Sequence, residues 1–179
     1  LQTVSFPAKA KLEMGSAVFS GCTELAAVDL PEGLTVLPYL TFENCASLTH
    51  VGLPKSLESI GDRNGGVFQN CTSLKSIEFP QGLKKIEKYA FLNTGLVRVQ
   101  IPASVETVAE GAFTQNNALN TVEFESGEMP HTLGMSVFSH CENLETVILR
   151  GTIPELPEEL FAYSSLKTLY IPASVQKIA

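Results

Sequence analysis

The sequence predicts an α/β solenoid in which a short strand, an extended leg and a short helical turn recur in every coil. Three observations lead to this prediction: a Leu-rich motif returns at a near-constant spacing, a second motif ending in Phe returns in phase with it, and proline usually follows the first motif. Units of this size cannot bury an apolar face alone, so they stack around one elongated core. We expect a right-handed superhelix with parallel strands on its concave face.

The first motif, Leu-x-x-(Val/Ile/Leu)-x-(Phe/Leu/Ile), predicts the strand of each repeat. Apolar and polar residues alternate in it, which is the period of a strand with one buried face. The proline that follows has no N–H and should end the strand. The spacing lies within the range of about 20 to 29 residues that is typical of leucine-rich repeats. Eight copies start 22 to 26 residues apart, at Leu1, Leu25, Leu48, Leu74, Leu96, Leu119, Leu144 and Leu166.

The second motif places one Phe at the same phase in every complete repeat. A position this uniform meets the same surroundings each time, so we expect the rings to stack as a column in the core. The residues before each Phe are helix formers with room for only one or two turns, which predicts the short helical turns. The column comprises Phe19, Phe42, Phe68, Phe91, Phe113, Phe138 and Phe161.

These repeats fill the chain, so residues 1–179 are predicted to form a single leucine-rich repeat domain of about eight repeats. The longer repeats locate insertions at Gly61–Gly66 and Ser126–His131, which we expect to bulge as surface loops. Neither end of the chain has the polar outer face of a capping unit, and we expect the chain to be a fragment of a longer array or to be capped through assembly.

The combined string Leu-x-x-Val-x-Leu-Pro-x-x-Leu-x-x-Ile-x-x-x-Ala-Phe-x-x-Cys resembles the BspA-like leucine-rich repeat family over essentially the whole chain. The departures are Glu125 and Arg150 in place of proline, and an irregular first repeat with Lys11 and Met14 at the positions of the leg. The resemblance implies a secreted or surface-anchored protein, commonly of host-associated anaerobic bacteria, that binds proteins or other surface ligands.

Composition excludes several classes of function. The chain is 44% hydrophobic and only 17% charged, which is the balance of a folded protein rather than a disordered one. Its net charge of −7 leaves no basic excess to neutralise nucleic acid or anionic lipid, so we expect neither as a partner. Every apolar run is broken well before the roughly 18 residues of a membrane span.

Four cysteines recur in one phase, three residues before the next leading Leu: Cys22, Cys45, Cys71 and Cys141, with Asn116 in the same position of the fifth repeat. Cys141 lies three rungs from its nearest counterpart, about 15 Å at strand spacing and too far for a disulfide. The others are neighbours in the stack but point the same way, a poor geometry for bridging. We therefore predict buried free thiols.

No pattern of catalytic or metal-binding residues is found. Three histidines, His50, His131 and His140, share no ligand spacing, and the chain has no Cys-x-x-Cys motif. Asp62 is a single carboxylate in its loop, too few for calcium. Nucleotide and nucleophile motifs are also missing. We predict no catalytic residues, no metal and no cofactor.

A ligand is expected on the solvent face of the strands, which is flat and several rungs long. Threonines there are explained by strand propensity, whereas Arg, Tyr and an outward Ile are typical of interfaces. We predict contacts centred on repeats five to eight. The candidate ligand-binding residues are His50, Glu78, Arg98, Gln100, Glu123, Ile148 and Tyr170.

The sequence therefore favours a non-enzymatic, adhesin-like module, extracellular or on the cell surface, that presents a concave sheet to a protein or glycan on a host or cell surface. A structural spacer supporting another functional domain is the alternative. An enzyme requires residues from outside this sequence to complete a site. Because a fold does not determine a function, the adhesin hypothesis depends on the family resemblance.

Overall fold

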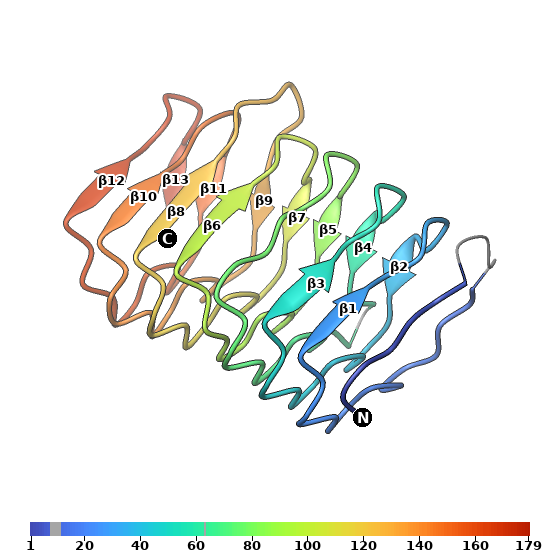
Figure 1. Ribbon diagram of the computed structural model, residues 1–179. Helices are drawn as coiled ribbons and strands as arrows, with labels where there is room; N and C mark the ends of the chain where they lie inside the picture. Colours follow the sequence, from blue (N-terminus) through green and yellow to red (C-terminus); the bar gives the residue numbers. More distant parts are fainter. Residues whose placement is uncertain (8–11, 63) are drawn as a thin grey trace.

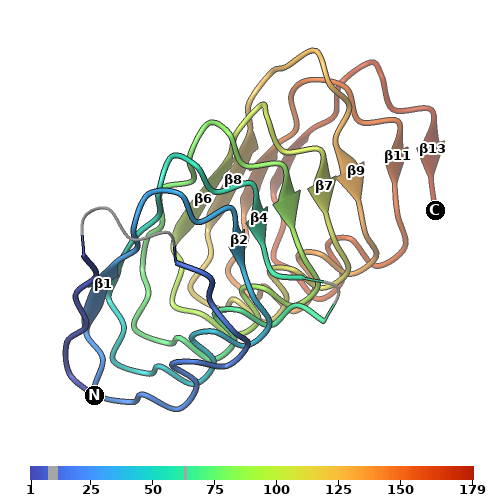
Figure 2. The same cartoon turned by 90° about the vertical axis from the view of Figure 1, so that its right-hand side faces the viewer.

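The computed structural model describes residues 1–7, 12–62 and 64–179. The chain winds into a stack of rungs, and most rungs contribute strands to two opposite sides of the stack (Figures 1 and 2). We call these sides the front sheet, formed by the first motif, and the back sheet, formed by the extended legs. The front strands are β1 (Ala27–Asp29), β3 (His50–Gly52), β6 (Arg98–Ile101), β8 (Thr121–Phe124), β10 (Thr146–Ile148) and β12 (Thr168–Tyr170).

The front strands pair in parallel, position for position along the motif. Arg98 of β6 lies beside Thr121 of β8, which lies beside Thr146 of β10. The sheet has two parts, β1–β3 and β6–β8–β10–β12, with repeat four between them. The parallel stacking predicted from the repeat is confirmed, and the break at repeat four is a feature that the repeat pattern did not predict.

The back sheet is built from strands of only two residues, in the legs that were predicted to be extended. They are β2 (Val36–Leu37), β4 (Ser59–Ile60), β5 (Lys85–Ile86), β7 (Thr107–Val108), β9 (Thr132–Leu133), β11 (Glu155–Leu156) and β13 (Lys177–Ile178). The order β2–β4–β5–β7–β9 is continuous, and β11 pairs with β13. Extended legs thus form a second parallel ladder along the stack.

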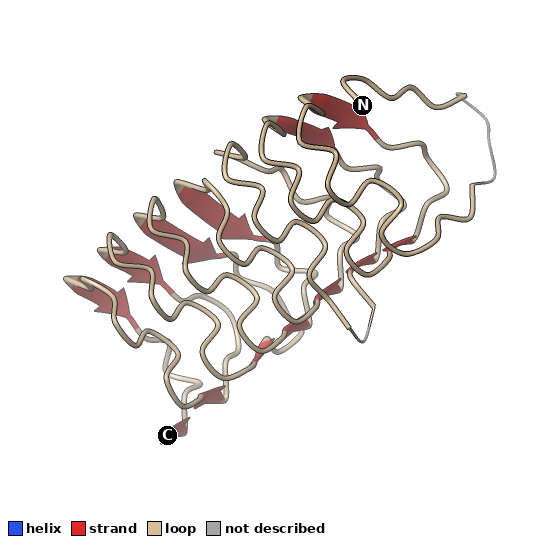
Figure 3. Ribbon diagram, turned by 90° about the horizontal axis from the view of Figure 1, so that it is seen from below, coloured by secondary structure: helices blue, strands red, loops and turns tan. Residues whose placement is uncertain are grey.

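The predicted helical turns are wrong. The described residues contain strands and hydrogen-bonded turns but no helix (Figure 3), so the fold is a β-solenoid rather than an α/β one. Two residues around each Phe take left-handed backbone angles, as Tyr89 (φ 53°) and Asn93 (φ 52°) do around Phe91. The Phe91 N–H donates to Ala112 O of the next rung at 2.8 Å. Both features are incompatible with a right-handed α-helix, in which every backbone angle is right-handed and each N–H donates to a carbonyl of the same segment.

The predicted Phe column is confirmed. Consecutive rings lie nearly parallel, with centroids 5.1 Å apart for Phe68–Phe91 and 5.9 Å apart for Phe138–Phe161. The five rings from Phe42 to Phe138 have no exposed surface. The column therefore runs through the stack without a gap.

Cys45, Cys71 and Cys141 are buried, Cys22 is half-buried, and all four are free thiols, as predicted. Each buried thiol donates to the carbonyl of a Phe in the preceding rung, as Cys141 Sγ does to Phe113 O at 3.2 Å. Asn116 fills the same position with its amide. Burial raises the pKa of Cys45 to about 11 and that of Cys141 to about 12, so these thiols remain protonated at neutral pH.

The two insertions differ from the predicted surface loops. In the first, Gly61, Gly65 and Gly66 are buried, and a Cβ on Gly65 would lie 1.7 Å from Lys88 O; residue 63 lies outside the described residues. In the second, most of 126–130 is exposed as expected, but His131 is fully buried. Its Nδ1 lies 2.5 Å from Val105 O, which anchors the loop to the core.

Candidate binding surface

The predicted ligand residues lie on the front sheet but form three separate groups. Arg98 and Glu123 belong to a charged group, Ile148 and Tyr170 to an apolar group, and His50, Glu78 and Gln100 lie around repeat four. The side chains of His50, Glu78, Arg98, Gln100 and Tyr170 are exposed, whereas Glu123 and Ile148 are half-buried.

The charged group is a triad across three rungs. Arg98 Nη2 lies 2.9 Å from Glu123 Oε2, and Arg150 Nη1 binds the other oxygen of the same carboxylate. Clamped in this way, the side chain of Glu123 is only 15% exposed. Both arginine side chains remain about half exposed or more, and two arginines against one glutamate give the triad a net positive charge on an acidic protein.

Arg98 was predicted to contact a ligand, and in the structure it binds a carboxylate within the chain, that of Glu123. Arg150 was absent from the predicted ligand residues, although its position was noted as a departure from the proline of the repeat. That departure could have indicated the pairing. An arginine in place of the proline puts a long side chain next to the sheet, where it reaches Glu123.

The apolar group lies at the last rungs. Ile148 of β10 is the register partner of Tyr170 of β12, so the two side chains are neighbours on the outer face. Tyr170 is 60% exposed, whereas Ile148 is half-buried rather than fully open to water. A partner would therefore meet Tyr170 first.

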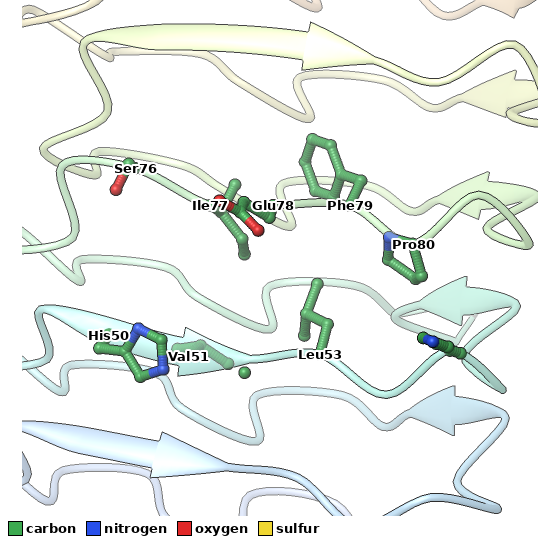
Figure 4. A pocket seen from close by; sticks show the side chains of 10 residues that line it. His50, Val51, Leu53, Ser76, Ile77, Glu78, Phe79 and Pro80 are labelled. Carbon is green, nitrogen blue, oxygen red and sulfur yellow. The ribbon is translucent and has the colours of Figure 1, made fainter.

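The residues around repeat four line two hollows on the same face. A hollow of about 320 Å³ is lined by His50, Gly52, Lys55, Ser76 and Glu78, together with apolar groups of the two rungs (Figure 4). A second hollow of about 280 Å³ lies on the other side of the same rung and is lined by Glu78, Gln81, Gln100 and Glu125. Glu78 borders both hollows. His50 also lies 3.1 Å from Asp29 Oδ1 of the preceding rung.

Among the residues that the structure describes, no group of three His, Cys, Asp or Glu side chains is arranged to hold a metal ion. The buried thiols donate hydrogen bonds to carbonyls instead. In the same part of the chain, no helix has the length and apolar character needed to cross a membrane.

Comparison with known families agrees with the motif analysis. A model of the BspA type leucine rich repeat region matches residues 1–120 and 64–179, and so covers the whole chain between the two matches. The chain belongs to the BspA-type leucine-rich repeat family. No curated protein matches this chain.

Solved bacterial structures support this membership of the BspA-type family. A leucine-rich repeat protein from Bacteroides ovatus ATCC 8483 aligns with a TM-score of 0.78 and 27% identity over 92% of this chain. The Leucine Rich Repeat protein of T. pallidum aligns with a TM-score of 0.71 and 27% identity over 84% of this chain. This chain spans 42% of the Bacteroides protein and 69% of the T. pallidum protein.

Proposed function

We propose that this BspA-type repeat chain is a non-enzymatic binding module that presents its front sheet to a protein ligand outside the cell. The observation that carries the proposal is the unbroken sheet β6–β8–β10–β12, which carries both the charged triad and the exposed Tyr170. Guanidinium groups and an aromatic ring are the side chains that most often anchor protein interfaces. The secreted or surface location comes from the family resemblance.

The exposed side chains of Arg98 and Tyr170 should contribute little to folding, which fits a surface that serves recognition. Arg98 and Tyr170 point away from the core, and the surface ion pair of Arg98 contributes little to stability. A rigid sheet also loses little conformational entropy when it binds, because its backbone is already ordered.

The test is a binding screen of the purified chain, multimerised to raise avidity, against an array of secreted and cell-surface proteins and an array of glycans. We expect a protein signal that falls at least tenfold in the variant Arg98→Ala/Ile148→Ala/Tyr170→Ala, since one interface anchor contributes more than about 1.4 kcal/mol. Lys85→Ala, on the exposed side of the back sheet, is the matched control and should bind as wild type.

Three outcomes would contradict this proposal. Signals that the triple variant leaves unchanged would favour the spacer alternative or binding through loops. A signal confined to glycans would mean that the ligand is a glycan rather than a protein, with the front sheet still the binding surface. Loss of binding in Lys85→Ala as well would show that the screen reports a general property of the fold.

A further inference from the structure

The front sheet is interrupted at repeat four, at the segment Ser76–Phe79. Within the described residues, the backbone N–H and C=O groups of Ser76–Phe79 make no hydrogen bond to the protein. The residues that flank this segment each make one backbone hydrogen bond: Lys75 O accepts from Val97 N–H, and Pro80 O accepts from Leu83 N–H. β3 pairs only with β1, and β6 only with β8. The edges of β3 and β6 that face repeat four therefore lack nearly all the backbone hydrogen bonds of a sheet.

The rest of the rung stays closed. Phe68 stacks on Phe91 at 5.1 Å, as elsewhere in the column. On the back sheet, Ile60 of β4 is paired with Ile86 of β5. At the base of the rung, a Cβ on Gly95 would lie 2.4 Å from Thr72 O, so repeats three and four are in close contact there. The opening is confined to the front sheet and is held between closed parts of the stack.

The opening exposes apolar positions that the next rung buries. Ile77 and Phe79 are half-buried, whereas Val99 and Ile101 at the same motif positions have at most 1% of their surface exposed. Between β3 and Ser76–Pro80 lies the 320 Å³ hollow. Figure 4 shows Leu53 between these two rungs and Glu78 on the facing rung. We call this hollow the repeat-four slot.

The N–H groups that face the slot can be assigned from the register. In β3, His50 N–H donates back to Ala26 O of the preceding rung. Ser76 holds the motif position of His50, and Glu78 holds that of Gly52. Alternate residues of a strand direct their N–H groups to the same side. Ser76 N–H and Glu78 N–H are therefore the donors directed at the slot.

We propose that the repeat-four slot binds an extended peptide segment of a partner protein, which adds to Ser76–Phe79 as a strand. The proposal rests on the proposed function and names the kind of segment that the partner presents. Unpaired N–H and C=O groups at strand spacing are matched by another extended backbone, which supplies both in alternation. Side chains of the peptide that point inward would cover Ile77 and Phe79, and those that point outward would meet Lys55, His50 and Glu78.

The probe is a displayed library of random linear dodecapeptides, selected on the wild-type chain and then measured as synthetic peptides. Glu78→Pro removes an N–H that faces the slot without breaking any hydrogen bond within the chain. Glu78→Ala is the matched control, because it removes the side chain and keeps the N–H. We expect Glu78→Pro to weaken the selected peptides at least tenfold and Glu78→Ala to change their Kd less than twofold.

A second measurement does not depend on how well the proline variant folds. In hydrogen exchange of the wild type, the amides of Ser76 and Glu78 should exchange freely and should slow at least tenfold when a selected peptide is added. The triple variant Arg98→Ala/Ile148→Ala/Tyr170→Ala should bind the same peptides as wild type. The peptide measurement therefore tests the repeat-four slot, whereas the protein array tests the proposed function, and either one can fail without the other.

Three results would overturn the slot as a strand-addition site. The first is a selection in which no peptide is sensitive to Glu78→Pro. The second is equal loss in Glu78→Pro and Glu78→Ala, which would mean that the Glu78 side chain and not the backbone is recognised. The third is a bound peptide that leaves the exchange of Ser76 and Glu78 unchanged.

Discussion

At the scale of single residues, the positions facing the core were predictable and those facing solvent were only partly so. Every buried thiol and Phe repeats in phase, so the sequence alone indicates its environment. Pairing on the surface depends on which side chains come together across rungs. Glu123 and Arg150 are 27 positions apart, and only the register of the stack shows that they bind each other. For that reason Arg98 and Glu123 were both predicted to contact a ligand, and their pairing with each other was not predicted.

Asn116 is the polar member of the cysteine column, and its replacement should be costly. Its Nδ2 donates to Phe91 O and Phe113 O at 2.7 Å each, and its Oδ1 accepts from Thr94 N–H. Asn116→Ala leaves Phe91 O and Thr94 N–H unpaired in the core and should lower the free energy of unfolding by about 1–3 kcal/mol. Urea denaturation measures this loss. The exposed Asn117→Ala is the control, and an equal effect in both variants would contradict the role assigned to the Asn116 amide.

The buried thiols should make stability fall at alkaline pH. Burial raises the pKa of Cys141 to about 12, so the folded chain keeps this thiol protonated while the unfolded chain ionises it above roughly pH 8.5. The stabilisation is complete below that pH and is lost as the pH rises toward 12. Urea midpoints at pH 8 and pH 10 should therefore differ more in wild type than in Cys141→Ala. Equal differences would show that other groups cause the alkaline loss.

At the scale of elements, strands were predicted well and turns were not. Apolar and polar residues alternate in the first motif with the period of a strand, and the six front strands lie within copies of that motif. The segment before Phe91 has helix-forming residues, but its neighbours in the stack outweigh that propensity. Tyr89 and Asn93 adopt left-handed angles so that each N–H can reach the next rung. Local propensity carries no information about such a partner.

The corrected turns have a spectroscopic consequence. A β-solenoid without helices should give a far-UV circular dichroism spectrum with a strand minimum and no separate 222 nm helical band. The measurement needs only the purified chain at neutral pH. A clear helical band would restore the short helical turns predicted from the sequence.

The Phe column should make the largest single contribution to stability. Phe91 is fully buried between Phe68 and Phe113, with centroids 5.1 Å away on both sides. Phe91→Ala should lower the free energy of unfolding by about 3–5 kcal/mol, through lost transfer energy and the cavity left behind. Phe161 is half-buried at the end of the column, so Phe161→Ala should cost less. Similar urea midpoints for the two variants would argue against a continuous column.

At the scale of the whole molecule, the break in the front sheet raises the question of whether the stack is one cooperative unit. The repeat pattern does not reveal the break, because Leu74–Pro80 has the same motif as Leu96–Pro102. Solenoid stability is the sum of the rungs and of the interfaces between neighbours. At repeat four the front ladder is lost, but the Phe column and the back sheet continue across it. Two of the three connections between the halves therefore remain.

We therefore expect both sides of repeat four to unfold together. Gly61 N–H donates to Leu37 O before the break, and Gly134 N–H donates to Val108 O after it, each at 2.8 Å in the back sheet. In native-state hydrogen exchange with increasing urea, the two amides should converge on one free energy of opening, because neither half can open without breaking the shared column. Phe68→Ala, in the column near the break, should separate them. If the amide of Gly61 already exchanges through a lower-energy opening in wild type, the front ladder and not the core column couples the rungs of this solenoid.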